Sequence, residues 1–130
     1  MKHGKNAAWQ YHHMGIPTTD AQPVEKYSST FRMYTTPGDN PFRIQWHRYE
    51  PGCPLHPLIQ RVPHVAFKVE SIDEAIAGYP VLLAPYFPFD GFRVAMIEVE
   101  GAPVELIETS LGEEQIWGGS KAHSTIYPGD

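Results

Sequence analysis

Residues 63–76 read PHVAFKVESIDEAI and contain the clearest structural pattern in the chain. Val65 and Phe67 alternate with small or polar residues, which is the period of a strand with one face in a core. Ser71 and Glu74 follow at the spacing of a capping box, in which each side chain accepts a hydrogen bond from the other's backbone N–H. The stretch therefore predicts a strand followed by a helix, with the helix covering the Val65 face of a sheet.

Working outward, the rest of the second half predicts three more strands separated by turns. They are expected at 80–87, 93–100 and 103–109. The first half predicts a similar but abridged unit, with a strand at 9–18, a weak helical segment at 19–29, and strands at 30–37 and 42–50. The span from His13 to Gln45 is shorter than that from His64 to Glu105 by about one strand and turn. We therefore expect the first copy to lack one hairpin strand.

The two copies are predicted to form one domain over residues 1–130, because neither could bury a sheet face alone. The expected class is α+β, with paired βαβββ modules at 8–50 (abridged to βαββ) and 63–110. Pro51, Pro54 and Pro57 make residues 51–62 a stiff extended connector. Residues 111–130 are expected to form a short helix at 111–117 and then a tail.

The composition excludes several classes of function. The formal net charge of −5 argues against nucleic-acid binding, which needs a basic face. The sequence contains no apolar run of the ~20 residues needed to span a membrane. A hydrophobic signal core is not found in residues 1–10, and the single cysteine, Cys53, cannot form an intrachain disulfide. We expect a cytoplasmic protein with a small-molecule substrate and no nucleic-acid or membrane partner.

Strand alternation places several polar residues on the sheet face opposite the helices. Because Val65 packs under the helix, His64 points the other way, and Glu105 does the same on the last strand of its module. The equivalent residues of the first module are His13 and Gln45.

Two imidazoles, an amide oxygen and a carboxylate suit a divalent first-row metal ion. His47 lies two residues after Gln45 and shares its face. It is a candidate for the fourth ligand, for a base or for a substrate contact. His12 falls on the opposite side of its strand, the side of Met14, where a structural or surface role is expected.

Residues 12–20 (HHMGIPTTD), 63–76 and 92–108 (FRVAMIEVEGAPVELIE) resemble the vicinal oxygen chelate superfamily. This superfamily includes glyoxalase I, methylmalonyl-CoA epimerase, extradiol dioxygenases, and bleomycin- and fosfomycin-resistance proteins. The resemblance is strongest over 62–109 and thinner over 10–50. It implies a curved, cup-like mixed sheet with helices on the outer face, and a metal ion held by the first and last strands of each module.

By position, the resemblance assigns the ligands as His13, Gln45, His64 and Glu105. This set looks like that of methylmalonyl-CoA epimerase, whereas His13, His64 and Glu105 alone match extradiol dioxygenases. The metal could be Zn, Ni, Co, Mn or Fe. A homodimer is also expected.

The resemblance implies a metal-dependent isomerase, epimerase or lyase of the glyoxalase-like type. Its substrate would be a small hydroxy-carbonyl, keto-acid or sugar-derived compound that reacts through a metal-stabilised enolate. Glu105 is the expected ligand and base, and His47 is the alternative base. Two other hypotheses are a non-haem Fe(II) dioxygenase and a metal-free drug-binding protein. The latter would have an apolar cup lined by aromatic residues, for which the candidates are Trp9, Tyr11, Tyr49 and Tyr86.

Overall fold

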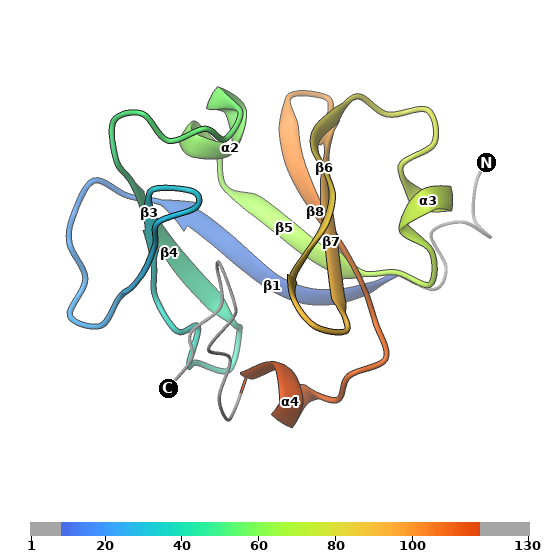
Figure 1. Ribbon diagram of the computed structural model, residues 1–130, viewed down its shortest axis with the longest axis horizontal. Helices are drawn as coiled ribbons and strands as arrows, with labels where there is room; N and C mark the ends of the chain where they lie inside the picture. Colours follow the sequence, from blue (N-terminus) through green and yellow to red (C-terminus); the bar gives the residue numbers. More distant parts are fainter. Residues whose placement is uncertain (1–8, 118–130) are drawn as a thin grey trace.

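The computed structural model of the protein describes residues 9–117. Its centre is an eight-stranded mixed sheet in the order β2-β3-β4-β1-β5-β8-β7-β6. The strands are β1 (Gln10–Pro17), β2 (Lys26–Ser28), β3 (Met33–Thr35), β4 (Ile44–Tyr49), β5 (His64–Lys68), β6 (Val81–Phe89), β7 (Phe92–Val99) and β8 (Ala102–Thr109). The sheet is curled, so that one of its faces is concave (Figure 1). The predicted α+β class and cup-like mixed sheet are confirmed.

The sheet topology brings the first and last strands of both halves to its middle. β1 pairs with β4 in parallel, β5 pairs with β8 in parallel, and β1 and β5 meet as antiparallel neighbours. In this register Gly15 is opposite both Gln45 and His64, while Ala66 is opposite Glu105. All four strands that carry the predicted ligands are therefore adjacent.

The first half differs from its predicted βαββ order. Residues 19–29 contain the short strand β2, which pairs with β3, and no helix. The first half therefore has four strands, so the predictions of a helix there and of a missing strand are both wrong. Pro23 disfavours a helix interior. In addition, Thr18 and Glu25 side chains accept hydrogen bonds from nearby backbone N–H groups, which competes with helix formation.

The outer face of the second half is the main hydrophobic core. Helix α3 (Ile72–Ala75) begins at the predicted cap, where Ser71 Oγ accepts a hydrogen bond from the Glu74 N–H at 3.2 Å. Ile72 and Ala75 pack on Val65 and Phe67, as the alternation predicts. Ile72 has no exposed surface, and burying such a side chain contributes about 1.5–3 kcal/mol.

The described residues form two further short helices. Helix α4 (Glu113–Trp117) confirms the predicted helix at 111–117, and its Ile116 packs with Phe92 and Ile107 in a second core cluster. Helix α2 (Pro57–Arg61) lies within the connector, which is therefore not extended throughout. Pro57 suits a first helical turn because its missing N–H would have no helical partner there. Among the described residues, no helix has the length and apolar character needed to cross a membrane.

Candidate metal centre

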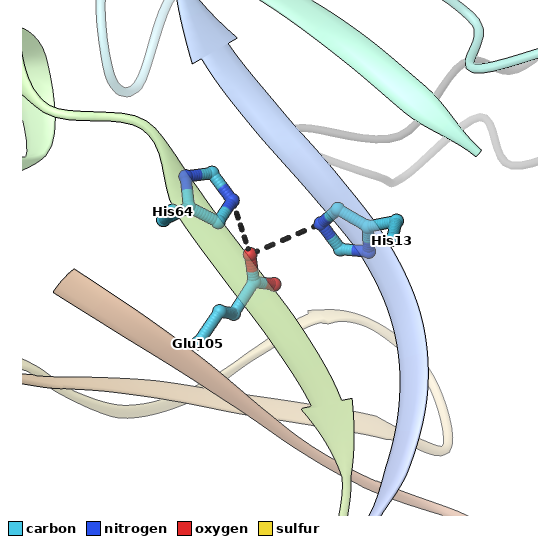
Figure 2. Close-up of side chains that lie close together, drawn as sticks. All are labelled: His13, His64 and Glu105. Atoms are coloured by element: carbon cyan, nitrogen blue, oxygen red, sulfur yellow. Dashed lines mark hydrogen bonds and ion pairs between the residues drawn. The ribbon is translucent and has the colours of Figure 1, made fainter. Parts of the chain in front are cut away.

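Three predicted ligands converge inside the cup (Figure 2). His13 on β1, His64 on β5 and Glu105 on β8 each place a ligand atom within 4.8 Å of the other two. His13 Nε2 lies 3.2 Å and His64 Nε2 lies 3.0 Å from the same carboxylate oxygen, Glu105 Oε1. Their exposed fractions are 1%, 5% and 3%, respectively. A buried group of two imidazoles and one carboxylate could hold a metal ion.

The two histidines favour the ionised form of the Glu105 carboxylate. Burial alone would raise the pKa of Glu105, but the charges of His13 and His64 and their hydrogen bonds hold that pKa well below its usual value. An ionised carboxylate buried this deeply needs cations beside it. The two imidazoles supply such a partner when protonated, and a bound cation would supply it when they are neutral.

A β-bulge in β1 determines how the neighbouring histidines face. The pairing register between β1 and β5 shifts between Tyr11 and His13, so one extra residue is accommodated in β1. His12 and His13 are consequently both buried on the inner side, where the His12 ring stacks on Trp117 at 5.2 Å. The prediction that His12 faces the Met14 side is wrong, because period-two alternation fails at a bulge.

His12 is placed to orient His13. The two Nδ1 atoms are 2.8 Å apart, so one donates a hydrogen bond and the other accepts it. Burial, followed by the charge of His13, lowers the pKa of His12 to about 3, so His12 is neutral. A metal ligand at His13 Nε2 requires the ring hydrogen on Nδ1, and His12 Nδ1 is the acceptor available for it. Sequence alternation missed this role of His12.

His47 is the fourth histidine at the centre. Its ring lies 5.4 Å from that of His64, centroid to centroid, and its Nδ1 is 3.0 Å from Thr35 Oγ1. Burial, then the nearby charges of His64 and His13, hold the pKa of His47 well below its usual value. His47 is therefore a neutral imidazole whose Nε2 is buried without a hydrogen-bond partner.

Gly15 leaves space for the rings of His47 and His64, which come from the strands on either side of β1. A Cβ at this position would clash with the His64 ring and lie 2.6 Å from His47 Nε2 and 2.7 Å from His64 Nε2. Both nitrogens thus approach the same point above the Gly15 backbone. Residue 15 must lack a side chain, a requirement that the strand pattern did not reveal.

His47 Nε2 is a buried nitrogen atom that suits a bound cation. It has no hydrogen-bond partner among the described residues, and His47 lines one cavity of about 30 Å³ together with Gln45 and His64. The Gln45 amide nitrogen is also buried without a partner, but it is a donor, so Gln45 would face an ion through its oxygen. Buried polar atoms are normally satisfied, and unpartnered ones in a native protein call for an explanation. The cavity has room for about two groups the size of a water molecule. His47 is outside the group of three convergent ligands, so the structure leaves the fourth ligand open between His47 and Gln45.

The aromatic residues expected to line a binding cup divide between the two faces of the sheet. Tyr49 and Tyr86 line the cavity, whereas Trp9 packs on Phe67 on the outer face and Tyr11 is 53% exposed. The four therefore do not form one aromatic cup.

A second surface depression lies away from the histidines. It is an open groove of about 700 Å³ whose lining includes Lys68, Arg93 and Glu108. Arg93 is paired with Asp73 at 3.2 Å and with Glu108 at 3.7 Å. Because the groove contains none of the convergent ligands, we assign the site to the smaller cavity.

Comparisons with known proteins support the fold. A scan against models of protein families found no match, and a search of curated proteins found none. Among solved structures, the chain is similar to a hypothetical protein, BH1468, from Bacillus halodurans C-125, with a TM-score of 0.54 and 17% identity. The match covers 82% of this chain and 99% of the other. The shared curled sheet is compatible with a glyoxalase-like fold, and identity this low carries no functional assignment.

Proposed function

We propose that this protein is a metal-dependent isomerase, epimerase or lyase of the glyoxalase-like type, from the vicinal oxygen chelate superfamily. The observation that carries the proposal is the convergence of His13, His64 and Glu105, buried and drawn from the central strands of both halves. The proposed substrate is a small compound with two neighbouring oxygens, of the hydroxy-carbonyl, keto-acid or sugar-derived kind.

The three residues have distinct roles in this proposal. His13 and His64 would hold the ion through their Nε2 atoms, and Glu105 would hold it through its carboxylate. When bound, the ion supplies Lewis-acid stabilisation of an oxyanion that develops on the substrate. Burial of these residues strengthens the charge interactions at the site, because the surroundings are less polarisable than bulk water.

His47 is the proposed proton-transfer residue. Its Nε2 is buried without a hydrogen-bond partner and faces the same space as His64 Nε2 above Gly15. The contact with Thr35 Oγ1 fixes its ring. A base must lie within hydrogen-bond reach of the proton that it removes, and a ligand in the cavity would place that proton near His47. Glu105, shared between two imidazoles, is better suited to hold the ion than to act as a base.

A non-haem Fe(II) dioxygenase is the second candidate. The observation in its favour is that the convergent group consists of two histidines and one carboxylate, which is the composition of the facial triad of such oxygenases. If His47 acts on substrate protons and Gln45 does not bind the ion, the remaining triad would leave three coordination positions open.

Metal binding is the first test. We expect protein purified without chelator, or apoprotein titrated with Zn²⁺, Co²⁺ or Mn²⁺ in a calorimeter, to bind about one ion per chain. His64→Ala should abolish binding. His56→Ala is the matched control, because His56 is exposed, caps α2 and is not one of the convergent ligands. Failure of all these ions and of Fe²⁺ to bind would overturn both enzyme functions and favour a metal-free binding protein.

The reaction class is tested next. For an isomerase or lyase, the loaded protein should exchange the proton adjacent to a carbonyl with D₂O, as followed by NMR. His47→Gln should slow the exchange without preventing metal binding. Oxygen consumption with Fe²⁺ and aromatic vicinal diols, without proton exchange, would instead establish the dioxygenase. The expected homodimer remains a prediction that analytical ultracentrifugation would test.

A further inference from the structure

The walls of the cavity beside the convergent ligands (His13, His64 and Glu105) are mainly apolar. They include Phe31, Met33, Ile59, Leu83, Val94 and Met96. Met33, Ile59, Val94 and Met96 have at most 4% exposure. These side chains come from both halves of the sheet and from α2, so any ligand held at the cluster is surrounded by them.

The cavity offers little to a charged or heavily hydroxylated ligand. Among the described residues that line it, none is a lysine or arginine. Its polar groups are the side chains of the three convergent ligands, those of Gln45 and His47, and the hydroxyls of Tyr49 and Tyr86. An anion bound away from the metal ion would lose its water and meet no compensating cation, which is unfavourable.

We propose, building on the proposed function, that the two chelating oxygens of the substrate are attached to a small, uncharged, apolar remainder. A keto acid fits if its carboxylate is one of the chelating oxygens. Phosphorylated, nucleotide-bearing and sugar-like remainders do not fit, because their charges or hydroxyls would be buried without partners.

The small size of the cavity favours a small remainder. At about 30 Å³ its free space is less than a few carbon atoms need, so side chains must move when the remainder binds. Met33 and Met96 are the walls best able to do so, because methionine is unbranched and adapts to irregular apolar shapes. Phe31 and Tyr86, whose rings are 5.6 Å apart, join the two halves over this space and restrict it further.

A matched pair of hydroxamates tests the proposal. The Zn²⁺-loaded protein is titrated calorimetrically with acetohydroxamate, pentanohydroxamate and glutarate monohydroxamate, which share one chelating group. The last two differ by a terminal methyl or carboxylate on the same chain. We expect pentanohydroxamate to bind more tightly than acetohydroxamate and the carboxylate analogue to bind at least ~10-fold more weakly than pentanohydroxamate.

A wall variant provides an independent measurement. Leu83 is half-buried on the edge strand β6, so Leu83→Arg places a cation at the cavity wall, and Leu83→Gln is the neutral control. Circular dichroism checks that both variants fold. The wild-type protein should prefer pentanohydroxamate to glutarate monohydroxamate. We expect Leu83→Arg to reduce or reverse this difference in affinity, and Leu83→Gln to leave it unchanged.

The outcomes separate the two proposals. Absence of Zn²⁺ binding in the loading step would overturn the proposed function and this inference together. Zn²⁺ binding followed by equal or tighter binding of the carboxylate analogue to the wild-type protein would overturn only the inference. The inference would also be wrong if neither long-chain hydroxamate bound the loaded protein, since the remainder would then not enter the cavity.

Discussion

Gly15→Ala adds one methyl group at the point where the His47 and His64 rings meet. The new Cβ would clash with the His64 ring and come within 2.6 Å of His47 Nε2. Real Cβ atoms essentially never approach other atoms this closely, so at least one ring must move. Gly15 is not among the residues with positive φ, so alanine suits its backbone and the effect arises from the site alone.

The size of the effect follows from two opposing contributions. Removing a glycine from the unfolded chain stabilises the fold by about 0.4–1 kcal/mol. Overpacking a well-packed interior costs about 1–3 kcal/mol. The clash involves two rings on adjacent strands that have little free space, so the second contribution should exceed the first. We expect a net loss of about 1–2 kcal/mol in the free energy of unfolding. Displacing His64 should also weaken metal affinity by about 10- to 100-fold or more.

Urea unfolding of the apoprotein and calorimetric Zn²⁺ titration measure the two effects separately. Gly112→Ala is the matched control, since among the described residues its Cβ would meet only Gln115 Oε1, at an ordinary distance of 3.7 Å. That control should leave metal affinity unchanged. Wild-type stability and wild-type Zn²⁺ affinity in Gly15→Ala would refute the assigned arrangement of His47 and His64.

Three further predictions concern the surroundings of the site. His12→Phe keeps an aromatic ring against Trp117 but removes the Nδ1 acceptor for His13, so Zn²⁺ affinity should fall about 10- to 100-fold in chelator competition. His12→Asn, whose amide oxygen can accept the same hydrogen bond, should lose less; equal losses would argue against the orienting role. Ile59→Ala removes a side chain with 2% exposure and should lower the free energy of unfolding by about 2–4 kcal/mol in urea titration, whereas an unchanged midpoint would contradict the packing of α2. Glu25→Gln removes a 2.7 Å ion pair with Arg48, whose hydrogen bond lowers the pKa of Glu25. The pKa of Glu25 is lower in the folded protein than in the unfolded chain. The wild-type protein should therefore have a higher Tm than Glu25→Gln above the ordinary carboxyl pKa of 4.5, and this difference should disappear as the pH falls through the depressed pKa. An advantage that stays constant from neutral to strongly acid pH would contradict this linkage.

The second half of the chain was predictable because its local signals agree with one another. The alternation of Val65 and Phe67 and the cap at Ser71 predict the strand and helix that the structure contains. The same alternation turns His64 and Glu105 to the inner face, where both are buried. A regular strand has a period of two, so the facing of its side chains follows from sequence alone.

The first half was less predictable because its structure depends on contacts outside each segment. Residues 19–29 have weak helical signals and contain β2, whose three residues are stabilised by pairing with β3. Tertiary pairing outweighs such weak propensities. The bulge after Tyr11 likewise depends on how β1 aligns with β5, and it moves His12 to the inner side.

By itself, the sequence determined the kinds of ligand and the sheet face on which His13, Gln45, His64 and Glu105 lie. Tertiary structure alone decided which of them meet. The distance between residues on different strands depends on pairing order and register, and local periodicity does not specify either. The antiparallel pairing of β1 with β5 and the parallel pairing of β5 with β8 bring His13, His64 and Glu105 together. The same pairing places His47 beside His64, with Gly15 as the residue small enough to permit it.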